Sequence, residues 1–264
     1  MQPPLTIRRA GRADFEAALA VIGRAFNLVV RAPSVHTMVA ESGQGGLLVA
    51  ERDGAIVGTS AYVSFGRTGW IGGVAVAEEE RGRGLGRALT VAALDALGPH
   101  ETVLLLASAA GRPIYERMGF VGEGMYRVFM SPDDARPTGS FRALGPADRD
   151  AVLALDARVT GESRALAVDC ALAGGVAAAT GVALRPPWPA RPILAPDPGE
   201  GAALLAAVLE PGVRLAVPEA NAAAVAALEG LGCVERAGVL RMRRGPAVDW
   251  RPTELWGVFS LFFG

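Results

Sequence analysis

The sequence of 264 residues contains no lysine, since all 26 of its basic residues are arginine. This absence excludes a catalytic Schiff-base lysine and the phosphate-binding lysine of a P-loop. The chain has only two cysteines and two histidines, namely Cys170, Cys233, His36 and His100. We therefore expect no disulfide framework, no metal site and no cysteine nucleophile, and a reducing cytoplasm as the compartment.

Long apolar runs are also missing. No segment approaches about 18 uncharged apolar residues, which predicts no transmembrane helix, and the opening residues "MQPPLTIRRAGRADF" hold no apolar signal core. Residues 254–264, "ELWGVFSLFFG", favour a docked C-terminal strand or an oligomer contact over a membrane anchor. The net charge of -1 gives no indication of a nucleic-acid or anionic-membrane partner.

The spacing of apolar residues predicts a mixed α/β unit over about the first 130 residues, in the order β-α-α-β-β-β-α-β-α-β. Asp53-Gly54 predicts a tight hairpin turn within residues 46–65, and Gly72-Gly73 indicates a bulge in the strand 70–77. Further strands are expected at 4–10, 102–108 and 126–130, and helices at 12–26, 34–43, 84–97 and 111–120.

The second half of the chain repeats the first. After a polar linker at 131–140, "FRALGPADRDAVLAL" aligns with "IRRAGRADFEAALAV" at an offset of 134 residues, and "VPEANAAAVAALEGLGCV" aligns with "LASAAGRPIYERMGFV" at an offset of 113. The difference between the offsets places the missing residues in the middle of the second copy. We expect a duplication whose second copy has lost its central segment.

The run "RGRGLGRAL" within residues 81–89 is the strongest motif. It is not a P-loop, because no lysine is present, and no register gives the G-x-G-x-x-G spacing of a dinucleotide fingerprint. It does fit R-x-x-G-x-G, with a strand before it and a helix after it. A glycine loop at a helix N-terminus presents free backbone N–H groups and the positive end of the helix dipole, which suit phosphate oxygens.

This pattern resembles the acetyl-CoA loop of the GNAT superfamily of N-acetyltransferases, [QR]-x-x-G-x-[GA]. The element order of the first unit and the segment "IYERMGF", similar to the family's "LYEKLGF" type, carry the same resemblance. The fold class that it implies is α/β (α+β, with mixed sheets), in two tandem GNAT-like domains, each a mixed twisted sheet flanked by helices. The domains would be residues 1–132 and a degenerate copy at 138–264.

The resemblance also implies the site residues. The backbone of Val74 to Val76 would pair with pantetheine as an added strand, and the loop would hold the diphosphate, with Arg81 either binding it or bracing the loop. Tyr115 matches the family's catalytic acid, although a core tyrosine is the alternative. Ser108 stands where many relatives have a cofactor-binding asparagine. The expected cofactor-binding residues are Val74, Ala75, Val76, Arg81, Gly82, Arg83, Gly84, Leu85, Gly86, Arg87 and Ser108.

The implied activity is transfer of the acetyl group of acetyl-CoA to a primary amine, by direct attack in a ternary complex. We expect the acceptor to be a small-molecule or peptide amine, and the protein to be a monomer or homodimer. The alternative is a non-catalytic acyl-CoA-binding or sensing module with a scaffold repeat. No general base stands out: a water chain is possible, and the carboxylate candidates are Glu51, Asp53, Glu78 and Glu79.

Four expectations concern individual segments. His36 is either an acceptor contact or an ordinary loop residue, and His100 is a surface residue. Glu78 to Glu80 should lie on a solvated turn. In the second copy, Leu228 takes the place of Tyr115 and the Arg/Gly loop is absent, so this copy should not bind acetyl-CoA.

Overall fold

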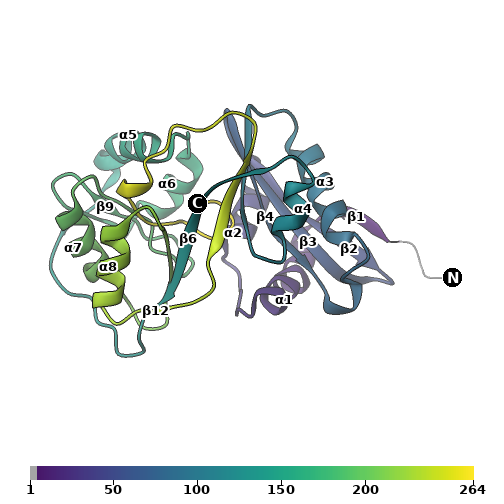
Figure 1. Cartoon of the computed structure of the whole chain (residues 1–264), viewed down its shortest axis with the longest axis horizontal. Helices are drawn as coiled ribbons and strands as arrows, with labels where there is room; N and C mark the ends of the chain where they lie inside the picture. The colour runs from purple at the N-terminus through teal and green to yellow at the C-terminus, as the bar shows by residue number, and fades with distance from the viewer. Residues whose placement is uncertain (1–4) are drawn as a thin grey trace. The chain divides into compact units, whose positions relative to one another are not determined.

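The computed structural model describes residues 5–264, and these divide after Leu105 into two compact units. Each unit combines a sheet with helices (Figure 1). No helix among the described residues is long and apolar enough to cross a bilayer. The observed class is thus α+β, with a mixed main sheet and a second, antiparallel sheet.

The first unit is built on a sheet in which sequential strands are neighbours. Its order is β1-β2-β3-β4-β5, antiparallel except for the parallel pair of β4 with β5. Short hairpins connect β2 to β3 and β3 to β4, whereas β1 and β2 are joined through two helices and a helical crossover follows β4. The strands are β1 (Thr6–Arg9), β2 (Gly45–Arg52), β3 (Ala55–Phe65), β4 (Thr68–Val76) and β5 (Thr102–Ala107).

Two local predictions in this sheet are confirmed. Asp53 and Gly54 both have positive φ, 52° and 74°, as a two-residue hairpin turn requires. In β4, Ala75 pairs with Thr59 and Gly72 pairs with Ala61, so one residue of β3 faces two residues of β4. This bulge includes Gly73, whose φ is 59°.

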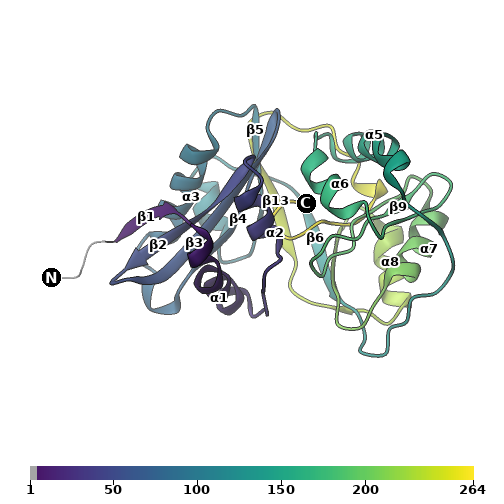
Figure 2. The same ribbon diagram turned by 180° about the vertical axis from the view of Figure 1, so that it is seen from behind.

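The helices of the first unit cover both faces of its sheet (Figures 1 and 2). Leu19 and Ile22 of α1 pack with Ile56, whereas Leu89 of α3 packs with Val57. Since neighbouring residues of a strand point to opposite faces, α1 and α3 lie on opposite sides. The helices are α1 (Phe15–Phe26), preceded by a 3-10 turn at Arg12–Asp14, α2 (Val35–Glu41) and α3 (Leu85–Leu97).

In the second unit, strand β6 (Val121–Met130) has partners that come only after residue 210. It pairs with β11 (Arg214–Pro218), β12 (Val234–Glu235) and β13 (Val239–Arg244), all antiparallel. This strand is longer than the expected 126–130, because β13 extends the pairing back to Val121. The segment 131–140 between the two halves contains no helix or strand, as expected.

The remaining strands of the second unit form a small antiparallel sheet in the order β14-β10-β9-β8-β7. Its strands are β7 (Arg142–Ala143), β8 (Val176–Ala177), β9 (Val182–Ala183), β10 (Ile193–Leu194) and β14 (Leu255–Gly257). The helices are α4 (Arg112–Glu116), α5 (Arg149–Thr160), α6 (Ala165–Ala171), α7 (Pro198–Val208) and α8 (Ala222–Gly230).

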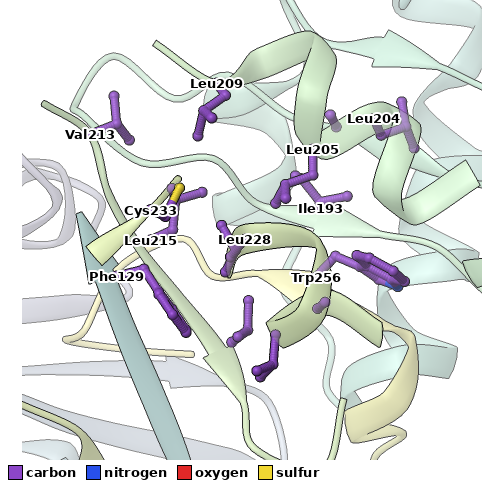
Figure 3. Close-up of a cluster of buried hydrophobic side chains, with 14 of the residues drawn as sticks. Phe129, Ile193, Leu204, Leu205, Leu209, Val213, Leu215, Leu228, Cys233 and Trp256 are labelled. Carbon is purple, nitrogen blue, oxygen red and sulfur yellow. The ribbon is translucent and has the colours of Figure 1, made fainter. Parts of the chain in front are cut away.

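The core of the second unit is gathered between α7, α8 and the strands beneath them (Figure 3). Leu204, Leu205, Leu228 and Ile193 are fully buried in it. Trp256 of β14 is 1% exposed and belongs to the same cluster. Residues 255–257 of the apolar C-terminal segment therefore form a docked strand, which is one of the two alternatives expected for it.

The two halves share a detailed local structure. Arg8 donates two hydrogen bonds to the Asp14 carboxylate, at 2.7 and 2.8 Å, and Arg142 does the same to Asp148, at 2.9 and 2.8 Å. In both halves the aspartate also accepts a 2.8 Å hydrogen bond from the backbone N–H of a glycine, Gly11 or Gly145. Helices of 12 residues follow in each case.

Candidate cofactor-binding site

The predicted phosphate loop lies where β4 ends and α3 begins, in the first unit. Val74 to Val76 form the last residues of β4, and Leu85 is the first residue of α3. Between them, a 3-10 turn at Glu78–Glu80 leads into the glycine-rich segment. The structure therefore brings together the expected strand, loop and helix residues in one continuous junction.

The loop requires glycine at two positions. Gly82 and Gly84 have φ of 76° and 80°, in the left-handed region that other residues adopt at a cost. A Cβ atom added to either would meet no heavy atom within 4 Å, so the surface above them is open. These glycines combine a fixed backbone shape with unobstructed access for a ligand.

Within the described residues, the N-terminus of α3 lacks a side-chain cap. Its N-cap residue is Gly84, which has no side chain to donate or accept a hydrogen bond, and the first turn holds no acidic residue. In the same unit, by contrast, Ser34 caps α2 by accepting a hydrogen bond from the N–H of Thr37. The first N–H groups of α3 are thus left to an external acceptor, and the helix dipole favours an anion there.

Arginine side chains surround this junction. Arg83 and Arg87 are exposed, and both supply positive charge beside the loop. Arg81 instead donates a 3.2 Å hydrogen bond from Nε to the carbonyl of Val76. Of the two roles expected for Arg81, the structure shows the bracing one, which ties the loop to the end of β4.

The acidic run before the loop is not a uniformly solvated turn. Glu78 and Glu79 are exposed as expected, but Glu80 is 6% exposed. Its carboxylate lies 2.9 Å from Nε of Arg52 and 3.6 Å from the guanidinium of Arg83. The expectation was wrong for Glu80 because Arg52 of β2, distant in the sequence, faces it. The ion pair with Arg52 offsets the desolvation cost of burying the Glu80 carboxylate.

Ser108 and Tyr115 belong to the second unit and lie close to each other there. Ser108 Oγ accepts a 3.3 Å hydrogen bond from the N–H of Gly111. A Cβ atom added to Gly111 would lie 3.0 Å from the Tyr115 ring and 3.5 Å from Ser108 Oγ. Tyr115 is 9% exposed, packs edge-on against Phe120, and has its pKa raised to about 12 by burial.

The candidate bases differ in their surroundings. Glu51 forms an ion pair with Arg8 at 2.7 Å. Asp53 occupies the hairpin turn. Glu78 and Glu79 stay exposed beside the loop.

The described residues contain no cluster of three or more His, Cys, Asp or Glu side chains that could hold a metal ion.

Both histidines are more buried than an ordinary loop or surface residue. His36 lies in α2, 7% exposed, and its Nε2 is 2.9 Å from the place that a Cβ of Gly73 would take. His100 is half-buried, and its Nε2 lies 2.8 Å from Ser64 Oγ.

Both cysteines are free thiols, and burial raises the pKa of the Cys170 thiol to about 11, which is typical of an unreactive residue.

The burial of His36 should make stability depend on pH. Burial lowers the pKa of His36 to about 4, below its ordinary value of 6.5. The unfolded chain therefore binds the proton first, and the free energy of unfolding should fall by about 3 kcal/mol as the pH drops from about 6.5 to 4. Urea titrations across this range should show a flatter profile for His36→Gln. If the profile of His36→Gln matches that of the wild type, the pH dependence has another source.

Comparison with known proteins gives a match to one family model and matches to solved structures. Residues 43–122 match the family model of the acetyltransferase (GNAT) domain. A provisionally named acetyltransferase from Pyrococcus horikoshii superposes with a TM-score of 0.84 at 22% identity, covering 98% of this chain and 96% of that chain. A GCN5-related N-acetyltransferase from Kribbella flavida gives a TM-score of 0.53 at 18% identity, covering 92% and 71%. A search of curated proteins by sequence finds no match.

Residues 43–122 are therefore similar to an acetyltransferase (GNAT) domain, and this segment contains the whole glycine loop and Tyr115. The likeness to the Pyrococcus horikoshii structure extends the shared fold over almost the full chain.

Proposed function

We propose that the chain is an acetyl-CoA-dependent N-acetyltransferase, which moves the acetyl group to a primary amine by direct attack in a ternary complex. The observation that carries the proposal is the uncapped N-terminus of α3 behind Gly82 and Gly84. Open N–H groups, a helix dipole and exposed Arg83 and Arg87 together suit a diphosphate. When bound, acetyl-CoA supplies an activated acetyl thioester.

The end of β4 offers a second element of recognition. Ile71 to Val76 continue beyond the three residue pairs that join β4 to β5, which run from Thr68–Thr102 to Trp70–Leu104. In the proposed complex, the backbone of Val74 to Val76 pairs with the pantetheine arm on this side, as an added strand would. The bulge at Gly73 supports this role, since bulges turn a strand away from its neighbour.

Tyr115 is proposed as the general acid. When the amine nitrogen attacks the thioester carbonyl carbon, the carbon–sulfur bond breaks and the thiolate takes a proton from the tyrosine hydroxyl. The amine loses its own proton to solvent or to a carboxylate. A pKa of about 12 keeps Tyr115 protonated at neutral pH, which is the state that a proton donor needs.

Tyr115→Phe tests this role. The phenyl ring retains the packing against Phe120 but removes the proton, so we expect kcat to fall by about 100-fold or more with the affinity for acetyl-CoA unchanged. Thiol release with a panel of amines gives kcat, and calorimetry gives the affinity. Tyr62→Phe, at the equally buried tyrosine of β3, is the matched control and should be fully active. Tight acetyl-CoA binding without turnover in the wild type would favour the non-catalytic module instead.

The second half is proposed as a degenerate copy of the first, occupying about residues 138–264. The shared Arg–Asp–Gly arrangement at positions 8, 14 and 11 and at 142, 148 and 145 supports this origin, because a common framework explains it better than helix periodicity does. The copy has Leu228, buried in its core, where the alignment places Tyr115. The acceptor is proposed to be a small or peptidic amine, in a protein that is a monomer or homodimer.

A further inference from the structure

The second unit contains strands that correspond to β4 and β5 of the first. After the shared Arg–Asp–Gly arrangement, the second half continues through β8, β9, β10, α7, β11 and α8, as the first continues through β2, β3, β4, α3, β5 and α4. Strands β8, β9 and β10 pair in sequence, as β2, β3 and β4 do. Strand β10 therefore takes the place of β4, and β11 takes the place of β5.

The chain itself fills the space between β10 and β11. Strand β14 pairs with β10 in the antiparallel sense, with Ile193 opposite Gly257 and Leu194 opposite Leu255, and it also contacts β11. In the first unit, by contrast, β4 and β5 pair directly through residues 68–70 and 102–104. An extended segment has thus been added at the equivalent of the slot beside β4.

Two buried polar contacts hold this segment. Asn221, the N-cap of α8, is 2% exposed and donates a 3.0 Å hydrogen bond from Nδ2 to the carbonyl of Leu255. Its position corresponds to Ser108 at the offset of 113 residues. The indole N–H of Trp256 donates a 3.2 Å hydrogen bond to the carbonyl of Ala195.

Trp256 also closes the approach to α7. Its ring lies so near Gly201 that a Cβ atom added there would be 2.1 Å from Cε2. Only glycine fits at this place in the first turn of α7. The indole thus covers the start of the helix that corresponds to α3.

Carboxylates occupy the N-terminus of α7. Asp197 accepts a 2.8 Å hydrogen bond from the N–H of Glu200, and Glu200 in turn accepts 2.9 Å hydrogen bonds from the N–H groups of Thr180 and Gly181. At α3, the corresponding position has neither a side-chain cap nor an acidic residue. The second unit thus provides both an extended peptide and an anion from its own chain.

We infer that Leu255–Gly257 and the Asp197 carboxylate form an internal substitute for an extended anionic ligand, which closes the slot between β10 and β11. The second unit is complete without acetyl-CoA and takes none. The chain therefore binds a single acetyl-CoA, a consequence that rests on the proposed function of the first unit.

Calorimetric titration of the full chain with acetyl-CoA tests the closed slot. The wild type should bind one equivalent, and Gly84→Glu should bind that equivalent about 100-fold or more weakly. A second equivalent bound by the wild type, or one equivalent bound by Gly84→Glu in addition to the weakened one, would show that the second slot is open and overturn the inference. Absence of binding by the wild type would instead overturn the proposed function. In that case the inference about Leu255–Gly257 is tested by the stability of this strand alone.

Hydrogen exchange measures that stability directly. In Asn221→Ser the hydroxyl can still cap Ala224, whose N–H now lies 3.0 Å from Oδ1 of Asn221, but it is too short to reach Leu255. We expect exchange of the amides in Leu255–Gly257 to accelerate about tenfold or more, while the amides of β2 and β3 and the affinity for acetyl-CoA stay unchanged. Equal exchange in wild type and variant would show that Asn221 does not hold the strand in the slot.

Discussion

Gly84→Glu should abolish the stabilisation of the protein by acetyl-CoA. At 100 times its dissociation constant, the cofactor should stabilise the wild type by about 2.7 kcal/mol, which raises the midpoint of thermal unfolding by several degrees. The variant places a carboxylate at the N-terminus of α3, where the proposal locates the diphosphate, and it strains a residue whose φ is 80°. We expect its affinity to fall by about 100-fold or more, and thermal unfolding with and without acetyl-CoA measures this loss.

Gly66→Glu provides the matched control. Gly66 also has positive φ, 74°, and open space where a Cβ would lie, but it precedes β4, whereas the loop follows it. This variant should lose a similar amount of intrinsic stability and keep the full acetyl-CoA shift. A shift retained by Gly84→Glu would place the cofactor elsewhere and remove the main support for the proposed function.

Asp156→Ala should destabilise the second unit by about 3–5 kcal/mol. The Asp156 carboxylate accepts hydrogen bonds of 3.1 and 2.6 Å from Arg164, and both side chains are 1% exposed. Arg164 also donates to the carbonyl of Gly264 and lies over the Phe259 ring, 5.1 Å from its centre. Removal of the carboxylate leaves the buried guanidinium charge of Arg164 without its ion-pair partner, so the cost of its desolvation is no longer offset. Urea unfolding at pH 7 measures the loss.

The same pair of helices supplies the control for this measurement. Arg149 of α5 binds Asp169 of α6 at 2.6 Å, but these side chains are 42% and 46% exposed. Asp169→Ala should therefore cost less than about 1 kcal/mol. If Asp156→Ala costs no more than Asp169→Ala, burial does not set the strength of this pair. The double variant Asp156→Leu, Arg164→Met should recover much of the loss, since it leaves neither charge unpaired.

The parts of the site that follow local rules could be predicted from the sequence. Positive φ at Gly82 and Gly84, the turn at Asp53-Gly54 and the bulge at Gly72-Gly73 all depend on what glycine permits in its immediate surroundings. Apolar spacing likewise indicated the helix after the loop. These features need no knowledge of which segments meet in the folded chain.

The contacts that the sequence did not indicate join distant segments. Glu80 is buried because Arg52 faces it from β2, and His36 is buried because α2 packs it against Gly73. The partners of β6 and the place of β14 between β10 and β11 depend on tertiary pairing, which two or three apolar residues in a short strand do not specify.

The pairing of β6 has a consequence for how the protein folds. In the first unit, strands β1 to β4 pair with their neighbours in sequence, so these contacts can form soon after the residues are made. Strand β6 must wait for partners such as Glu235, which lies 108 positions beyond Arg127. Such separation slows folding, because the entropy of closing a long loop is lost before the favourable contacts of the strand pair can form. During synthesis, β6 is thus an uncovered strand edge for the time needed to make about a hundred residues, and it is the segment that we expect chaperones to shield.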